Sequence, residues 1–374
     1  MPPNARPHTV ITGGAGFIGS HLAEHLAAAG HRLTLIDDLS TGSRDNIAHL
    51  LDGKADRTPQ ARLIVGRASE VLRGADVDLS GASVFHLAAS VGVQLVVDSP
   101  AAMMHNNLGE TAAVLDACAA HRSRVLITSS SEVYGLCPEV PLHEDTPLVF
   151  GPTTASRWSY GLAKALDEHL ALDLGRAGRL RPTVVRLFNT VGPRQIGRYG
   201  MVVPRFVAAA VAGEPLQVFG DGTQTRTFCD VRDVVRALAR LMASDDAIGE
   251  VVNIGGSDEI SIAALAEEVL TVAAEARPGA KPDKQEASPR ETPAPGTRLV
   301  PYESVYGPGF EDPPQRRPAT DKIRRLIGWS PAIPLRQTLR ELVSAAAVQE
   351  PAASSNSPTR GHLKPQAATA DHAG

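Results

Sequence analysis

Residues 12–21 read TGGAGFIGSH, and this stretch decides the fold. An apolar run at 8–13 precedes the glycines and predicts a strand, and the amphipathic run at 18–29 predicts a helix. Gly13, Gly16 and Gly19 lie at the junction, where glycine lets the backbone turn tightly and approach a pyrophosphate. Free N–H groups and the helix dipole stabilise that charge. The stretch therefore predicts the first strand-turn-helix unit of a dinucleotide-binding sheet.

Asp37 is the second element of this site. It ends the next predicted strand, 18 positions after Gly19, where a carboxylate accepts hydrogen bonds from the adenosine ribose hydroxyls. A carboxylate would also repel a 2′-phosphate, so the sequence favours NAD over NADP.

The rest of the chain repeats the alternation of short apolar runs and amphipathic stretches, which is typical of βαβ units. Helices are expected at about 18–29, 101–121 and 157–177. The predicted strands are 8–13, 31–37, 61–66, 82–88, 123–130 and 183–189. Six such strands predict an α/β fold with a Rossmann-like, doubly wound parallel sheet.

Beyond residue 190 the pattern becomes irregular and richer in Gly and Pro, which favours a smaller C-terminal lobe that binds the substrate. We expect residues 1–190 to form the NAD-binding domain and 191–350 mainly the substrate lobe, with some segments returning to the sheet. The Pro-rich, charged stretch 276–297 is expected to be a mobile loop, and 351–374 a disordered tail.

Composition narrows the partners, metals and cellular compartment that can be expected for this protein. The 374 residues carry a formal net charge of -4, which gives no reason to expect a nucleic-acid or membrane partner. No targeting or membrane-spanning segment is evident. Three widely spaced cysteines, Cys118, Cys137 and Cys229, fit neither a disulfide framework nor a zinc site, so a reducing cytoplasm and no metal are expected.

Tyr160 and Lys164 stand four residues apart on one face of the predicted helix 157–177. A lysine one turn away lowers the pKa of a phenol, and the tyrosinate can take a proton from a carbinol as hydride leaves its carbon. Taken alone, such a pair is more often two surface residues.

The run TSSSEVYG (128–135) gives the pair weight, because it follows a predicted strand at the sheet edge where ligands bind. Ser129, Ser130 or Ser131 is positioned to hydrogen bond the sugar-type hydroxyl that is oxidised, beside Glu132. A helix cap or turn is the alternative interpretation of these hydroxyls.

In combination, these motifs resemble those of the nucleotide-sugar epimerases, dehydratases and decarboxylases, which are extended short-chain dehydrogenases/reductases. The resemblance runs from about residue 9 to 345. The motifs are glycines 13, 16 and 19, HLAA (86–89), SSSEVYG (129–135), Tyr160 with Lys164, RLFNTVGPR (186–194) and VFGDGTQTRTFCDVRDVV (218–235). The cofactor contacts that the resemblance implies are Gly13, Gly16, Phe17, Ile18, Gly19, Asp37, Leu87, Ala88, Ala89, Asn106, Tyr160 and Lys164.

The acid before VYG discriminates within the family. Dehydratases carry an Asp-Glu pair and 4-epimerases small residues, whereas Ser131-Glu132 is similar to the UDP-glucuronic acid decarboxylases. The resemblance implies conversion of UDP-glucuronic acid through a 4-keto intermediate to UDP-xylose, or release of UDP-4-keto-xylose. Tyr160 would be the base, and Glu132 with Ser130 or Ser131 would orient the sugar ring and manage the proton at C5.

The resemblance also implies a nucleotide site at Asn189, Arg226 and Arg316, with Arg316 placed either at the diphosphate or at the sugar carboxylate. Arginine suits both anions because its planar fork donates two parallel hydrogen bonds. Two positions depart from the family pattern. Arg67 follows Gly66 where an aspartate commonly contacts adenine, and Glu110 replaces a threonine after Gly109.

Two other functions stay open. A nucleotide-sugar 4-epimerase acting on UDP-glucose or UDP-glucuronate would share the 4-keto intermediate, although Glu132 argues against it. A non-catalytic NAD-binding regulatory protein would not need Tyr160 and Lys164. In relatives the helices matching 101–121 and 157–177 form a four-helix dimer interface, so a homodimer is expected, with burial against the chain's own sheet as the alternative.

Overall fold

The structure is a computed structural model in which part of the chain is described. The described residues are 6–52, 60–74, 77–90, 99–197, 200–276, 296–307 and 310–349. The expected loop 276–297 lies almost wholly outside them, and the expected tail 351–374 lies outside them completely. Within the described residues, none of the helices combines the length and the apolar character needed to cross a membrane.

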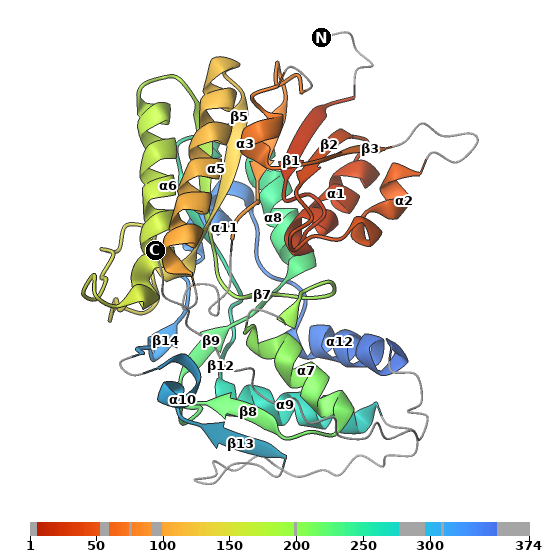
Figure 1. Ribbon diagram of the computed structural model, residues 1–374, viewed down its shortest axis with the longest axis vertical. Helices are drawn as coiled ribbons and strands as arrows, with labels where there is room; N and C mark the ends of the chain where they lie inside the picture. The colour runs from red at the N-terminus through yellow and green to blue at the C-terminus, as the bar shows by residue number, and fades with distance from the viewer. Residues whose placement is uncertain are drawn as a thin grey trace, which may run out of the picture.

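A parallel sheet forms the centre of the molecule (Figure 1). Its strands lie in the order β11-β6-β5-β4-β1-β2-β3, and every neighbouring pair is parallel. The strands are β1 (His8–Thr12), β2 (Arg32–Asp37), β3 (Ala61–Val65), β4 (Ser83–His86), β5 (Arg124–Ser130), β6 (Arg181–Leu187) and β11 (Val251–Ile254). The inner strands are buried along almost their whole length, as expected for a parallel sheet covered on both faces.

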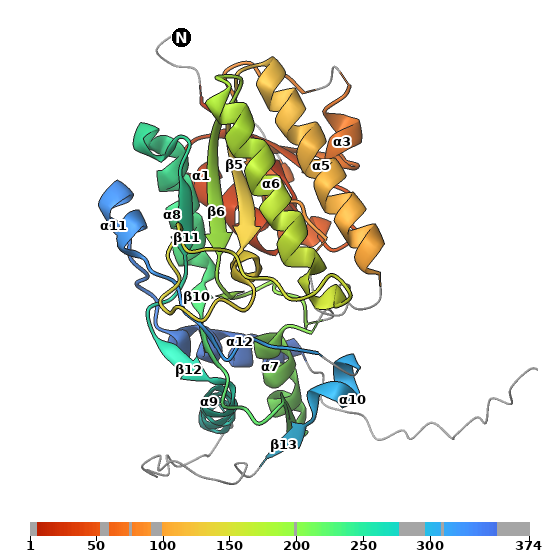
Figure 2. The ribbon, with the colours of Figure 1, turned by 90° about the vertical axis from the view of Figure 1, so that its left-hand side faces the viewer.

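Helices cover both faces of this sheet, so the predicted Rossmann-like, doubly wound fold is confirmed (Figure 2). One face packs against α1 (Phe17–Ala28), α8 (Val231–Ala243) and α11 (Asp321–Ile327). The other packs against α3 (Ala68–Val71), α5 (Pro100–Ala120) and α6 (Ser159–Arg176). Short helical segments are α2 (Ala48–Leu51), η1 (Arg44–Asn46), η2 (Ser131–Tyr134), η3 (Ser156–Trp158) and η5 (Asp245–Ala247).

The expectation of six strands was wrong by one, because β11 adds a seventh at the edge next to β6. This strand has four residues and comes from the irregular second half of the chain, so periodicity alone does not reveal it. Helices α8 and α11 also return to the sheet layer from that half. The boundary at residue 190 therefore stays a prediction.

A smaller lobe lies at the end to which β5 and β6 point (Figures 1 and 2). Its apolar core includes Phe206, Leu265 and Leu339 from three helices. Those helices are α7 (Val202–Ala212), α9 (Ile262–Glu275) and α12 (Leu335–Gln349), accompanied by the short α10 (Tyr302–Tyr306). Its strands are β7 (Thr190–Val191), β8 (Leu216–Phe219), β9 (Thr225–Thr227), β10 (Cys229–Asp230), β12 (Glu259–Ser261), β13 (Thr297–Val300) and β14 (Gln315–Arg316).

Candidate functional site

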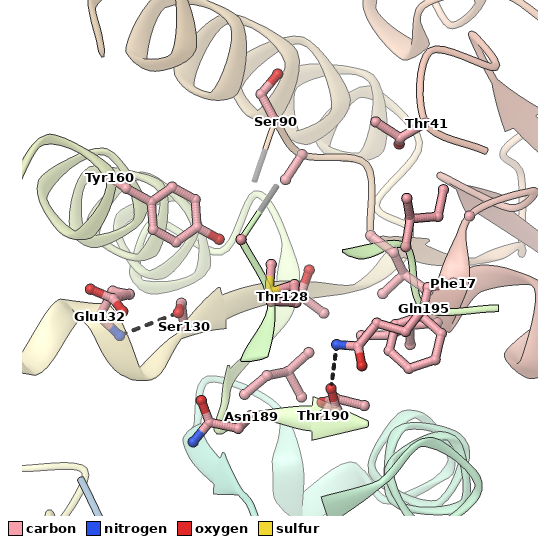
Figure 3. A pocket seen from close by; sticks show the side chains of 18 of the residues that line it. Phe17, Thr41, Ser90, Thr128, Ser130, Glu132, Tyr160, Asn189, Thr190 and Gln195 are labelled. Carbon is pink, nitrogen blue, oxygen red and sulfur yellow. Dashed lines mark hydrogen bonds between the residues drawn. The ribbon is translucent and has the colours of Figure 1, made fainter. Parts of the chain in front are cut away.

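A cavity of about 710 Å³ opens between the carboxyl ends of the sheet strands and the smaller lobe (Figure 3). Ligands of open α/β sheets bind at this edge. All the residues that the sequence assigned to the site line this cavity. They are Gly13, Gly16, Phe17, Ile18, Gly19, Asp37, Leu87, Ala88, Ala89, Asn106, Ser129, Ser130, Ser131, Glu132, Tyr160, Lys164, Asn189, Arg226 and Arg316.

The glycine turn between β1 and α1 leaves room for a phosphate group. Gly13 has a φ of +70°, and a Cβ there would lie 2.8 Å from the backbone nitrogen of Ala88. A Cβ on Gly19 would lie 2.0 Å from the carbonyl oxygen of Gly13. Only glycine permits this close backbone packing at the start of the helix. The turn thus fits the pyrophosphate of a dinucleotide.

Asp37 is held rigidly at the end of β2. Its Oδ2 accepts a hydrogen bond from the backbone nitrogen of Ala15 at 2.9 Å, and its Oδ1 accepts one from Leu39 at 2.8 Å. Burial raises the pKa of Asp37, while these backbone hydrogen bonds oppose the rise. The carboxylate therefore anchors the glycine turn and remains at the cavity wall, where the sequence predicts the ribose.

The two departures from the family pattern pair with each other. Nε of Arg67 lies 2.8 Å from Oε1 of Glu110, and Nη2 of Arg67 donates to Oδ1 of Asn106 at 3.2 Å. Glu110 also accepts hydrogen bonds from the backbone and the hydroxyl of Ser69, at 2.9 and 2.6 Å. Glu110 thus fixes the Arg67 guanidinium at the wall of the cavity that Asp37 also lines.

We expect Glu110→Gln to weaken NAD binding about threefold without changing kcat, because a partly exposed ion pair contributes little free energy. Calorimetric titration with NAD measures the affinity. Glu70→Gln, at an exposed position near Ser69, is the matched control. A fall in kcat with unchanged NAD affinity would contradict this role for the pair.

Tyr160 lies in the first turn of α6, with Ser130 and Glu132 close to it in the cavity (Figure 3). Burial raises the pKa of Tyr160, the Glu132 and Asp167 carboxylates raise it further, and the Ser130 hydroxyl opposes them. Of the three serines that the sequence left open, Ser130 is therefore the one beside the phenol. Its hydroxyl also accepts a hydrogen bond from the backbone nitrogen of Glu132 at 3.2 Å, which is the capping role that had been the alternative.

Lys164 is one turn farther along α6 and almost fully buried. Its Nζ lies 3.0 Å from Oδ2 of Asp167, whose side chain is completely buried. The expected lowering of the Tyr160 pKa by Lys164 is therefore not what the structure displays. The physical reason is that burial of the phenol raises the pKa of Tyr160, and the Glu132 and Asp167 carboxylates raise it further.

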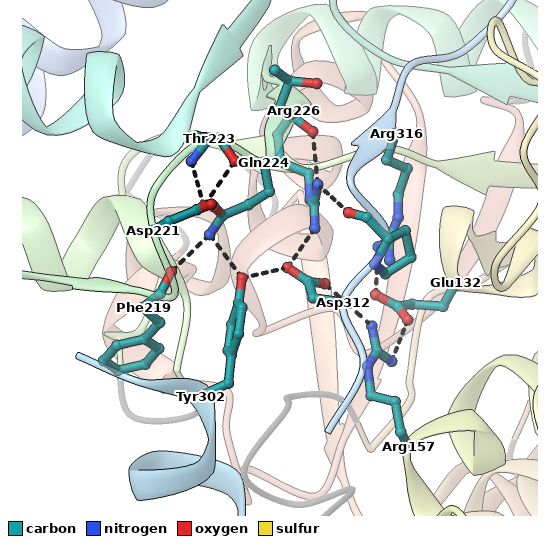
Figure 4. Close-up of polar contacts among 12 residues, drawn as sticks. Glu132, Arg157, Phe219, Asp221, Thr223, Gln224, Arg226, Tyr302, Asp312 and Arg316 are labelled. Carbon is teal, nitrogen blue, oxygen red and sulfur yellow. Dashed lines mark hydrogen bonds and ion pairs between the residues drawn. The ribbon is translucent and has the colours of Figure 1, made fainter. Parts of the chain in front are cut away.

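Glu132 lies between two buried arginines (Figure 4). Nη1 of Arg157 lies 2.5 Å from its Oε2, and Arg316 forms an ion pair with its Oε1. Burial alone would raise the pKa of Glu132, but the two guanidiniums together lower it well below its usual range. Glu132 is therefore a fixed anion rather than a proton carrier at neutral pH.

Arg226 and Asn189 line the cavity and form hydrogen bonds with residues of the smaller lobe. Nη2 of Arg226 lies 2.7 Å from Oδ2 of Asp312, and Nη1 donates to the carbonyl of Pro313 at 3.0 Å. Asp312 also accepts a hydrogen bond from the hydroxyl of Tyr302 at 3.0 Å (Figure 4). Asn189 donates to the carbonyl oxygen of Thr227 at 2.8 Å.

Three residues of this site were not identified from the sequence: Arg157, Asp312 and Asp167. Arg157 lies three residues before Tyr160, and that spacing could have placed it near the same helix end. Asp167 lies three residues after Lys164, which is also a neighbouring position on a helix. Asp312 meets the arginines through tertiary packing alone, and no local pattern signals it.

Proteins named as nucleotide-sugar decarboxylases are similar to this chain over most of its length. The chain is 36% identical to a UDP-N-acetyl-alpha-D-glucosaminuronate decarboxylase of Bacillus cytotoxicus, over 89% of this chain and 96% of that protein. It is 32% identical to UDP-glucuronic acid decarboxylase 4 of Arabidopsis thaliana, over 89% of this chain and 67% of that protein.

Solved structures agree with the fold. A dTDP-glucose 4,6-dehydratase of Streptomyces venezuelae, solved with NAD bound, superposes with a TM-score of 0.72 at 25% identity, covering 90% of this chain and 95% of that one. A UDP-N-acetylglucosamine 4-epimerase of Methanobrevibacter ruminantium gives a TM-score of 0.74 at 26% identity, covering 92% and 99%.

The family profile described as "NAD dependent epimerase/dehydratase family" matches residues 9–255. This match covers the glycine turn, Asp37, the serine-glutamate run and the Tyr160/Lys164 pair, so the predicted resemblance and the NAD cofactor are both confirmed. The chain belongs to the NAD-dependent epimerase/dehydratase family of extended short-chain dehydrogenases/reductases.

Proposed function

We propose that this protein decarboxylates a UDP-linked uronic acid, with UDP-glucuronic acid as the substrate and UDP-xylose as the product. The observation that carries the proposal is the Glu132 carboxylate, held between Arg157 and Arg316 beside Tyr160. The relatives named as decarboxylases of nucleotide-linked uronic acids support the reaction class.

The charges at this end of the cavity favour a strongly anionic substrate. Three buried guanidiniums, on Arg157, Arg226 and Arg316, face two carboxylates, on Glu132 and Asp312. One positive charge therefore stays uncompensated within this cluster. A buried positive charge is costly unless an anion pairs with it, and a uronic acid on a diphosphate supplies such anions.

The chain's own residues would act on the sugar in two places. NAD, when bound, supplies a hydride acceptor that can later return the hydride. Tyr160 would take the proton of the sugar 4-hydroxyl, with Ser130 hydrogen bonded to the same oxygen. The resulting 4-ketone is β to the carboxylate, so the C5–carboxylate bond breaks, carbon dioxide leaves, and its electron pair moves into the carbonyl as an enolate.

Arg157 and Arg316 hold Glu132 as an anion. Glu132 would orient the sugar ring so that the sugar carboxylate can leave as carbon dioxide. A proton must then return to C5 before the ketone is reduced to the pentose. If the 4-keto pentose leaves before that step, UDP-4-keto-xylose is the product instead.

Incubation of the purified protein with NAD and each candidate sugar tests the proposal. The candidates are UDP-glucuronic acid, UDP-N-acetylglucosaminuronic acid and the neutral UDP-glucose. We expect carbon dioxide and a UDP-pentose from UDP-glucuronic acid, read by headspace analysis and product mass. Release from the N-acetylated acid alone would correct the substrate, and 4-epimers without carbon dioxide would replace the decarboxylase by a 4-epimerase.

We further propose a homodimer through α5 and α6, which lie side by side on one face of the sheet (Figure 2). Exposed apolar side chains support it: Met104 and Leu108 on α5 are each 37% exposed, and Leu166 on α6 is 53% exposed. Met104 and Leu108 are four residues apart and so share one face of the helix. Both helices also bury an opposite face against the sheet, which is the alternative that the sequence left open.

We expect Leu166→Glu to convert the dimer to a monomer, because it would bury an unpaired charge in an apolar interface. Size-exclusion chromatography with light scattering measures the mass. Leu299→Glu, at a 42% exposed position on β13, is the control and should leave the dimer intact. A wild-type protein that is monomeric at all concentrations would contradict the proposal.

We also infer a cytoplasmic location. Cys118, Cys137 and Cys229 are free thiols, and burial raises the pKa of Cys118 to about 12. Unpaired cysteines are typical of a reducing compartment.

A further inference from the structure

A chain of buried polar side chains starts at α6, one helical turn from Tyr160. It begins at Lys164 and Asp167, whose Nζ and Oδ2 are 3.0 Å apart. The Thr111 hydroxyl favours the ionised form of the Asp167 carboxylate, and it lies 3.1 Å from Nε2 of His86. Nδ1 of His86 lies 2.7 Å from the hydroxyl of Thr12 at the end of β1.

This arrangement solves an electrostatic problem at Lys164. Its ammonium group lies on a residue that is only 2% exposed, and an unpaired charge in such a place is strongly destabilising. Within the described part of the chain, Asp167 supplies the carboxylate that pairs with it. Because the two residues are three apart on α6, the pair also fixes the direction of the lysine side chain.

Other charged groups near Tyr160 have partners of their own. Glu132 on η2 is held by Arg157 and Arg316, and Glu168 on α6 is held by Arg186 of β6, whose Nη2 lies 2.8 Å from Oε2. Each of these carboxylates therefore has a guanidinium group as its partner.

His86 on β4 does not titrate near neutral pH. Burial, together with the Lys164 ammonium, lowers the pKa of His86 to about 3, so its ring is neutral. Burial raises the pKa of Asp167, and the Lys164 ammonium and Thr111 hydroxyl oppose that rise. Asp167 is thus the carboxylate whose charge acts on both Lys164 and Tyr160.

We propose that Asp167 is a positioning residue: its carboxylate, 3.0 Å from Nζ of Lys164, fixes the ammonium group one helical turn from Tyr160 and so influences proton transfer to the phenol. The carboxylate offsets the ammonium charge and disfavours the tyrosinate. Tyr160 consequently reaches its proton-accepting form at a higher pH than a Tyr/Lys pair without this aspartate would. This inference rests on the proposed chemistry only in that Tyr160 acts as a base, which a 4-epimerase would share.

Replacing Asp167 by asparagine keeps the shape and removes the charge. We expect the acidic limb of the kcat/KM profile to move to lower pH by about one unit, because one nearby negative charge is lost. Above that limb, kcat should fall about tenfold as Lys164 loses its fixed direction. The matched control is Asp173→Asn on the same helix, where the carboxylate is 67% exposed and pairs with Arg176.

Two further variants keep the test decisive if Asp167→Asn folds poorly. Asp167→Glu retains the charge and should keep the limb near that of the wild type. Thr111→Val removes the hydroxyl that favours the Asp167 anion, so it should move the limb in the same direction as Asp167→Asn by a smaller amount.

A measurement that needs no turnover tests the pair itself. The chain has six lysines, so ¹⁵N labelling of lysine gives a simple spectrum, and Lys164→Met identifies the signal. We expect slowly exchanging ammonium protons on Lys164 in the wild type and their loss in folded Asp167→Asn. If no sugar is turned over, the proposed function fails while this signal still decides the pairing.

Two results would overturn the inference. One is an acidic limb that is unchanged in a folded Asp167→Asn protein. The other is a wild-type Lys164 signal that exchanges as fast as those of exposed lysines.

Discussion

Replacement of Tyr160 by phenylalanine is expected to slow carbon dioxide release about a thousandfold, the usual range for loss of a positioned acid-base group. The phenol lies in the cavity beside Ser130 and Glu132, and phenylalanine keeps its packing while removing the oxygen. Steady-state assays of carbon dioxide release measure the effect. Binding of NAD and of the uronic acid should change little, since the loss lies in the chemical step.

Tyr134→Phe is the matched control for this variant. Tyr134 lies in the same SSSEVYG segment, but it is buried outside the cavity, and its hydroxyl donates to Oδ1 of Asn253 at 2.8 Å. Its loss should reduce stability slightly and leave kcat nearly unchanged. Comparable rates in Tyr160→Phe and the wild type would remove Tyr160 from the chemistry.

Glu132→Gln is expected to lower kcat about a hundredfold while KM for the uronic acid stays the same or falls. The amide cannot pair with both Arg157 and Arg316, so these guanidiniums would attract the anionic substrate but no longer hold it in the orientation that expels the carboxylate. Parallel kcat and KM measurements separate the two effects.

The control for Glu132→Gln is Glu139→Gln, an exposed carboxylate that follows the same segment. The pH profile supplies a second check. Because the Glu132 carboxylate raises the pKa of Tyr160, its removal should move the acidic limb of the kcat/KM profile to lower pH, as is expected for Asp167→Asn. An unchanged kcat would show that Glu132 is merely part of the wall.

Local sequence patterns were sufficient for the cofactor half of the molecule. Gly13, Gly16 and Gly19 follow a strand and begin a helix, and Asp37 ends the next strand, so both features can be identified within about thirty residues of sequence. The long helices α5 and α6 were predicted for the same reason, since their apolar positions repeat over several turns.

Contacts between distant segments could not be predicted in this way. Arg316 reaches Glu132 from 184 residues away, and Asp312 reaches Arg226 from 86 residues away. Strand β11 joins the sheet edge from the same half of the chain. Arg67 and Glu110 each departed from a family pattern, and their pairing became evident only when β3 and α5 were placed together.

The most direct test of the central claim is the reaction of UDP-glucuronic acid with the protein and NAD in deuterium oxide. Loss of the carboxylate leaves an enolate that must take a proton at C5, so decarboxylation puts deuterium from the solvent on that carbon. We predict a UDP-pentose that carries one carbon-bound deuterium at C5, formed together with carbon dioxide. A product that keeps its carboxylate, inverts C4 and gains no carbon-bound deuterium would contradict the account.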